Sequence, residues 1–195
     1  METNGRAGRP LPRVGVSACL LGERVRYDGA EKGDPWIRDV LGRYVAFVPL
    51  CPEVEAGFPV PRGPIRLEGD PGAPRVISVE GRRDHTERML RFSRERVRAL
   101  EGEGLCGFVF KSRSPSCGLR RVEVHRPGEP PLPRGTGIFA RAFVERFPSI
   151  PAVEEGDLAD PEGRRRFVTS IFDAALGKGA VPRPHPLERA LLDLC

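Results

Sequence analysis

The stretch L-C-G-F-V-F-K-S-R-S-P-S-C-G, residues 105–118, decides the fold class of this chain. Its first half is a short apolar run, typical of a buried strand, and its second half is a small polar turn that carries Cys117. Such apolar runs alternate with helical patterns along the chain, an order typical of a mostly parallel sheet. The stretch therefore predicts an α/β protein in which a thiol follows the carboxyl end of a sheet strand.

Two other predicted strands end in the same way. Residues 13–18 (R-V-G-V-S-A) come directly before Cys19, and residues 44–50 (Y-V-A-F-V-P-L) come directly before Cys51. In open parallel sheets, ligands bind at the edge formed by the carboxyl ends of the strands. If the three strands are neighbours, Cys19, Cys51 and Cys117 therefore line one crevice.

Helical patterns fill the chain between and after these strands. The best of them, residues 86–101, has an apolar stripe and ends at Gly102. Further helices are expected at four places: from Asp34 to Leu41, over 138–146, from 157 to 176 and over 186–194. Two segments are expected to be loops: 57–83, with a short hairpin at 76–79, and the proline-rich 126–134. The pattern predicts a single Rossmann-like α/β domain, with a mostly parallel sheet flanked by helices, plus a C-terminal helical tail.

The domain boundaries are expected where the composition changes. Residues 1–12 are rich in Gly, Arg and Pro and predict a flexible basic tail. Residues 13–177 form the predicted domain with all three cysteine turns, and residues 178–195 form a linker and a short final helix.

Charge and hydropathy predict where the protein is located and which partners it binds. The net charge is +5, and no apolar stretch approaches the roughly 20 residues needed to span a bilayer. No signal peptide is found at residues 1–12, so we expect a cytoplasmic protein with reduced thiols and no membrane partner. The charge favours anionic partners such as nucleotides or RNA, and it is equally typical of an arginine-rich, GC-biased genome. No motif indicates nucleic-acid binding, and the sequence contains no signal for an oligomeric state.

Three convergent thiols suit several kinds of site: a metal ion, an iron–sulfur cluster or a single activated nucleophile. Zinc ligands usually come in close pairs, whereas these cysteines are separated by 31 and 65 residues and no C-x-x-C motif occurs. Small residues such as Ser114, Ser116 and Gly118 leave room for a bulky group and expose N–H donors that can bind sulfur. The turns therefore favour a cluster, while a coincidental placement of the thiols stays open.

Three stretches together resemble the signatures of the thiouracil desulfurase family. They are V-S-A-C-L-L-G-E-R-V-R-Y-D-G (16–29), P-L-C-P-E-V-E-A-G-F-P-V-P-R (49–62) and K-S-R-S-P-S-C-G (111–118). The resemblance extends over roughly residues 13–147, and it implies that residues 13–177 are the catalytic domain.

The resemblance implies a cofactor and the residues that hold it. It implies a [4Fe–4S] cluster on Cys19, Cys51 and Cys117, at the sheet edge of an α/β fold, and removal of sulfur from thiolated pyrimidines. In the family pattern, a glutamate and a serine at the positions of Glu53 and Ser114 take part in catalysis.

The expected reaction follows from three ligands on four irons, which leave one iron open as a Lewis acid. The sulfur of 2- or 4-thiouracil, or of a related nucleoside or nucleotide, binds there, and water replaces it without net electron transfer. The products are uracil and sulfide, and Glu53 (or its neighbour Glu55) shuttles the proton. Two alternatives stay open: a non-catalytic iron–sulfur protein that senses redox state or oxygen, and a structural zinc protein.

Four residues are expected to contact the substrate. Tyr27 can stack on a pyrimidine ring, and Asp28 can accept a hydrogen bond from a ring N–H. Lys111, together with Arg62, can bind a phosphate or ribose, and Ser116 is a further polar contact and an alternative to the catalytic serine.

Overall fold

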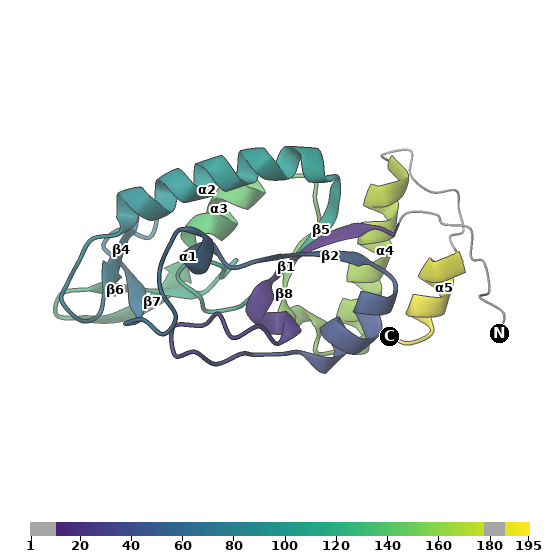
Figure 1. The fold of residues 1–195 in the computed structure, drawn as a ribbon, viewed down its shortest axis with the longest axis horizontal. Coiled ribbons are helices and arrows are strands. Elements are labelled where there is room, and N and C mark those ends of the chain that lie inside the picture. The colour runs from purple at the N-terminus through teal and green to yellow at the C-terminus, as the bar shows by residue number, and fades with distance from the viewer. Residues whose placement is uncertain (1–10, 178–185) are drawn as a thin grey trace.

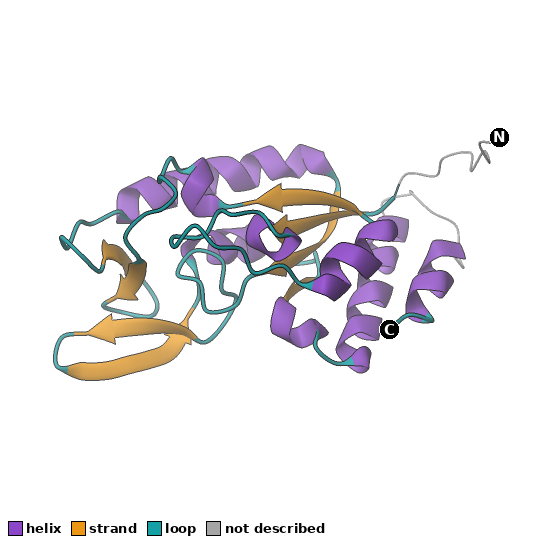
Figure 2. Ribbon diagram, turned by 60° about the horizontal axis from the view of Figure 1, so that its bottom comes forward, coloured by secondary structure: helices purple, strands orange, loops and turns teal. Residues whose placement is uncertain are grey.

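The computed structural model describes residues 11–177 and 186–195. Residues 1–10 of the predicted basic tail and residues 178–185 of the predicted linker lie outside the described residues. Within these ranges the chain forms two four-stranded sheets with helices packed against them (Figures 1 and 2). No helix in this described part of the chain is long and apolar enough to cross a membrane.

The first sheet is wholly parallel and carries the predicted cysteine turns. Its strands have the order β2-β1-β5-β8. Their bounds are β1 Arg13–Ser17, β2 Ala46–Leu50, β5 Leu105–Phe110 and β8 Ala152–Glu154. Ser17 lies opposite Leu50, and Val16 lies opposite Val109, so three of the strands end level with one another. The sheet therefore confirms the expected adjacency of the strands that precede the cysteines.

Helices cover both faces of this sheet. Alternation along β5 sends Phe108 and Phe110 toward α2 (Thr86–Leu100) and α3 (Ile138–Arg146), whereas Val109 packs toward α4 (Pro161–Gly177). Figure 1 shows α2 and α3 side by side on one face and α4 on the other.

The helix α4 packs directly on β5 at Gly107. A Cβ at Gly107 would meet Ile171 at 2.5 Å and Phe167 at 3.2 Å, so only glycine fits at this crossing. The short α5 (Pro186–Leu192) packs against α4 and buries Leu191, which confirms the predicted C-terminal helix.

The second sheet was not predicted. It has the order β4-β3-β6-β7, and its bounds are β3 Ile65–Glu68, β4 Arg75–Ser78, β6 Val122–Arg126 and β7 Glu129–Gly135. β3 and β4 form an antiparallel hairpin, β6 and β7 form another, and β3 pairs with β6 in parallel. Figure 2 shows the second hairpin at one end of the molecule. The mostly parallel character thus belongs to the first sheet.

The prediction of a proline-rich loop at 126–134 is wrong, because much of this stretch is β7. The strand contains three prolines but lies at the edge of the second sheet and pairs only with β6. At a sheet edge, a missing proline N–H can face outward without breaking the ladder.

The helix expected from Asp34 is also irregular. The Asp34 carboxylate accepts a hydrogen bond from the Ile37 amide at 2.9 Å, as an N-cap does. The chain then forms a π-helix over Trp36–Val40 and a 3₁₀-helix over Leu41–Arg43.

Candidate functional site

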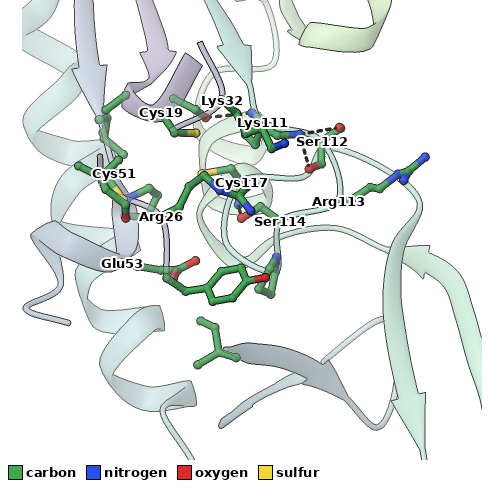
Figure 3. Close-up of a pocket in the computed structure, with 18 of the residues that line it drawn as sticks. Cys19, Arg26, Lys32, Cys51, Glu53, Lys111, Ser112, Arg113, Ser114 and Cys117 are labelled. Carbon is green, nitrogen blue, oxygen red and sulfur yellow. Dashed lines mark hydrogen bonds between the residues drawn. The ribbon is translucent and has the colours of Figure 1, made fainter. Parts of the chain in front are cut away.

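A cavity of about 470 Å³ opens at the carboxyl edge of the first sheet. The ends of β1, β2 and β5 contribute Cys19, Cys51 and Lys111 to its wall, and the turn after β5 contributes Ser114 and Cys117. Figure 3 shows the three cysteines in one part of this cavity, with residues of the neighbouring loops around them. The structure thus brings the three predicted cysteines together, and their role as ligands stays a prediction.

Each thiol is placed by a short element that begins where a strand ends. Cys19 lies in a 3₁₀-helix, Ala18–Leu21, and its carbonyl accepts a hydrogen bond from the Lys32 amide at 2.9 Å. Cys51 is the N-cap of α1 (Pro52–Glu55). The Cys117 amide donates to Oγ of Ser114 at 3.1 Å, which closes the polar turn.

The surroundings of the thiols oppose their ionisation. Burial, with a further contribution from nearby Cys51, raises the pKa of Cys19 to about 11. Burial also raises the pKa of Cys51, and it raises that of Cys117 well above the ordinary value, with added repulsion from the other two sulfurs. With pKa values raised in this way, the three thiols stay protonated unless a positive centre stabilises their thiolates. A bound metal does this, since it deprotonates a thiol that coordinates it.

The donor atoms present bear on the kind of centre that the cavity can hold. Among residues 11–177 and 186–195, no group of three or more His, Cys, Asp or Glu side chains is arranged to hold a single metal ion. A tetrahedral zinc site needs its sulfurs within about 2.3 Å of one ion. The donors present are three cysteine sulfurs that line one cavity, and iron–sulfur clusters are normally held by cysteine thiolates, so the residues fit such a cluster.

Glu53 lies in the first turn of α1 and reaches the same cavity (Figure 3). Its side chain is 12% exposed, and its Oε2 accepts hydrogen bonds from the Arg62 guanidinium at 2.5 and 2.9 Å. Its Oε1 accepts from Oγ of Ser116 at 2.9 Å. The carboxylate is therefore held on both oxygens beside the cysteines.

Ser114 also lines the cavity. Its Oγ accepts hydrogen bonds from the amides of Ser116, at 3.2 Å, and Cys117, at 3.1 Å. Because the oxygen acts as the acceptor in both bonds, its own O–H proton stays available for a molecule in the cavity.

The four predicted substrate contacts separate into two pairs. Tyr27 and Lys111 line the cavity, and Tyr27 is 41% exposed. Asp28 and Ser116 are not among the lining residues. Asp28 accepts from the Ala30 amide and from Arg26, and buried Ser116 donates to Glu53, so both have protein partners in place of a substrate.

The cations of the cavity differ from those expected. The Lys111 ammonium forms an ion pair with Glu155, and Arg62 is occupied by Glu53. Lys32 and Arg113 also line the cavity, and neither side chain has a hydrogen-bond or ion-pair partner within the described ranges. Arg113 additionally lines an adjoining cavity of about 490 Å³ on the second sheet. Sequence reasoning missed both residues because each stands in an ordinary polar loop.

Two glutamates at the end of β8 were also missed. Glu155 accepts from the amide and hydroxyl of Ser112, each at 2.7 Å, and Glu154 accepts from the Leu119 amide at 2.9 Å. Although burial favours the protonated form, the bonds from Lys111 and Ser112 hold the pKa of Glu155 below its usual value. The pair thus anchors both ends of the loop that carries Cys117. A strand of three residues is too short to be recognised from sequence periodicity.

Comparisons with known proteins agree with this geometry. A solved structure described as the [4Fe-4S]-dependent thiouracil desulfidase TudS superposes with a TM-score of 0.61 at 29% identity, covering 87% of this chain and 99% of that one. The uncharacterized protein YbbK of Bacillus subtilis (strain 168) is 29% identical over 109 residues, which are 53% of this chain and 71% of YbbK. The profile of the 2-thiouracil desulfurase family matches residues 14–155, a range that contains the three cysteine turns, Glu53 and Ser114. The chain therefore belongs to the 2-thiouracil desulfurase family.

Proposed function

We propose that this enzyme hydrolyses the carbon–sulfur bond of a thiolated pyrimidine, with a [4Fe–4S] cluster held by Cys19, Cys51 and Cys117. The observation that carries the proposal is the convergence of three cysteine thiols, Glu53 and Ser114 on one cavity, with Cys19 and Cys117 buried and Cys51 half-buried. The match to the 2-thiouracil desulfurase family and the similarity to the [4Fe-4S]-dependent thiouracil desulfidase TudS support the cofactor and the substrate class. With three protein ligands, the cluster supplies an iron without a protein ligand, which acts as a Lewis acid toward the substrate sulfur.

The residues of this chain supply the proton transfers. Glu53 accepts a proton from the water that attacks the thiolated carbon, and it returns a proton to the departing sulfur. Ser114 donates its O–H to a ring heteroatom and so orients the pyrimidine, while Tyr27 offers its ring as a stacking surface. One C=S bond and one water are replaced by one C=O bond and hydrogen sulfide, so no electrons are consumed.

The reaction is tested with protein reconstituted without oxygen and supplied with 4-thiouracil or 4-thiouridine monophosphate. We expect uracil (or uridine monophosphate) and sulfide in equal amounts, with no added reductant. A stoichiometric demand for a reductant would show that the chemistry is not hydrolytic. A loaded cluster that releases no sulfide from either compound or from 2-thiouracil would reject the proposed activity.

The unpartnered cations favour a substrate with a negatively charged group. Lys32 and Arg113 line the cavity, and neither side chain is paired with an anion in the part of the chain that the structure describes. Because Arg62 and Lys111 are already paired, the role that sequence analysis gave them passes to Lys32 and Arg113. We propose that these two residues bind the phosphate of a thiolated nucleotide.

Replacing either free cation is expected to affect the nucleotide and not the free base. Lys32→Ala or Arg113→Ala should raise KM for 4-thiouridine monophosphate about tenfold, as expected for the loss of one charged hydrogen bond. KM for 4-thiouracil should stay unchanged, and so should the kinetics of Arg91→Ala, a substitution at an exposed residue of α2 away from the cavity. Equal KM changes for nucleotide and free base would contradict the phosphate contact.

A further inference from the structure

We propose that Arg62 is a positioning residue that fixes the carboxylate of Glu53, so that Oε1 and not Oε2 exchanges the proton. The inference rests on the proposed function, in which Glu53 is the proton carrier. The sequence suggested that Arg62 binds a phosphate or ribose, whereas in the structure all of its side-chain donors contact the protein.

The guanidinium of Arg62 is fully occupied by the protein. Nε and Nη2 donate to Oε2 of Glu53, Nη1 and Nη2 donate to the Val25 carbonyl, each at 3.2 Å, and Nη1 donates to the Pro59 carbonyl at 3.1 Å. An arginine has five N–H donors, and these five bonds use all of them. No donor is left for a phosphate or a ribose.

These bonds join three segments of the cavity wall. Glu53 belongs to α1, Val25 to the loop after Cys19, and Pro59 to the loop that precedes β3. The Arg62 amide also donates to the Tyr27 carbonyl at 2.8 Å. Arg62 therefore fixes Glu53 relative to the loop that carries the predicted stacking residue.

The ion pair between Arg62 and Glu53 is shielded from solvent. The Arg62 side chain is 5% exposed and the Glu53 side chain 12% exposed. Water competes little for such a pair, and each partner depends on the other for compensation of a buried charge. The carboxylate is therefore kept in one orientation, and its two oxygens are not equivalent.

Counting acceptor sites assigns a role to each oxygen of Glu53. Each carboxylate oxygen accepts about two hydrogen bonds. Oε2 accepts two from Arg62, whereas Oε1 accepts one from Ser116. Only Oε1 keeps a free acceptor site for water or for the departing sulfur.

The test compares Arg62→Lys with Arg96→Lys in the reconstituted full-length protein. Arg96 is a matched control because it pairs with Glu55 of the same short helix, at 2.9 Å, outside the cavity. Lysine keeps the charge of Arg62 but loses the planar fork of donors. We expect Arg62→Lys to lower kcat about 10- to 100-fold, since small misplacements of a catalytic group have effects of this size, with KM and iron content unchanged. Arg96→Lys should leave all three quantities unchanged.

A double-mutant cycle distinguishes positioning from a general structural effect. If Arg62 acts through Glu53, the variant Glu53→Gln/Arg62→Lys should have a kcat within about twofold of Glu53→Gln alone. The proposal would be overturned if the kcat losses of the two single variants multiplied in the double variant. A rise in KM with unchanged kcat for Arg62→Lys would also overturn it, because it would mean that Arg62 contacts the substrate. Wild-type kinetics for Arg62→Lys would also overturn it.

Ser116→Ala provides a second test if Arg62→Lys folds poorly. It removes the one donor to Oε1 found among the described residues and leaves the bonds of Arg62 intact. We expect a lower kcat at unchanged KM, and an unchanged kcat would contradict the assignment of Oε1. Full activity of Glu53→Gln would instead reject the proposed acid–base role itself, so the two failures are distinguishable.

Discussion

Cys117→Ala is expected to abolish both cluster binding and desulfuration. Cys117 is buried beside the other two cysteines, and no other cysteine among the described residues lines the cavity. Two remaining thiols cannot replace a set of three ligands. Iron and acid-labile sulfide, measured after reconstitution without oxygen, should fall from about four of each per chain to a small fraction of that value. The same loss is expected for Cys19→Ala and Cys51→Ala.

Cys106→Ala is the matched control. Cys106 is 4% exposed and Cys117 is 7% exposed, but the Cys106 thiol points toward the Gly104 carbonyl inside the core and does not line the cavity. Its removal should leave the iron content and the visible spectrum of the cluster unchanged. Full iron in Cys117→Ala, or an equal loss in Cys106→Ala, would contradict the proposed ligand set. Zinc in place of iron would support the structural alternative.

Glu53→Gln is expected to stop turnover while the cluster stays bound. Glutamine has nearly the shape of glutamate and can still accept the Ser116 hydrogen bond, but it cannot carry a proton at neutral pH. Loss of a general acid–base group typically lowers kcat about 100- to 10,000-fold. Sulfide release should show this decrease, and iron content and the absorption spectrum should match the wild type.

Glu55→Gln separates the two glutamates of α1. Glu55 accepts hydrogen bonds from Arg96 and from the Cys51 amide, and it does not line the cavity. We expect the Glu55→Gln variant to retain most of the wild-type desulfuration activity. A sensor would keep its cluster response in Glu53→Gln, because a response to oxygen or redox state needs no proton carrier. Equal kcat values for the two variants would mean that Glu53 is not the proton shuttle.

Much of the first sheet could be predicted because its signals are local. An apolar run followed by a small polar turn identifies β5 and the Cys117 turn without reference to the rest of the chain. The second sheet could not be predicted in this way. β7 contains prolines that normally exclude a central strand, and only its place at an edge makes them compatible with pairing.

The same difference between local and long-range information applies to the residues of the candidate site. The position of Cys19, Cys51 and Cys117 directly after apolar strands could be predicted from the sequence, because strand periodicity and turn composition are properties of neighbouring residues. Which polar residues line the cavity with a free side chain became known only from the folded structure. Arg62 is occupied by Glu53, and Lys111 by Glu155, which lies 44 residues away along the chain. The ion-pair partner of a charged side chain depends on distances and burial in the folded protein, and neither can be read from the sequence.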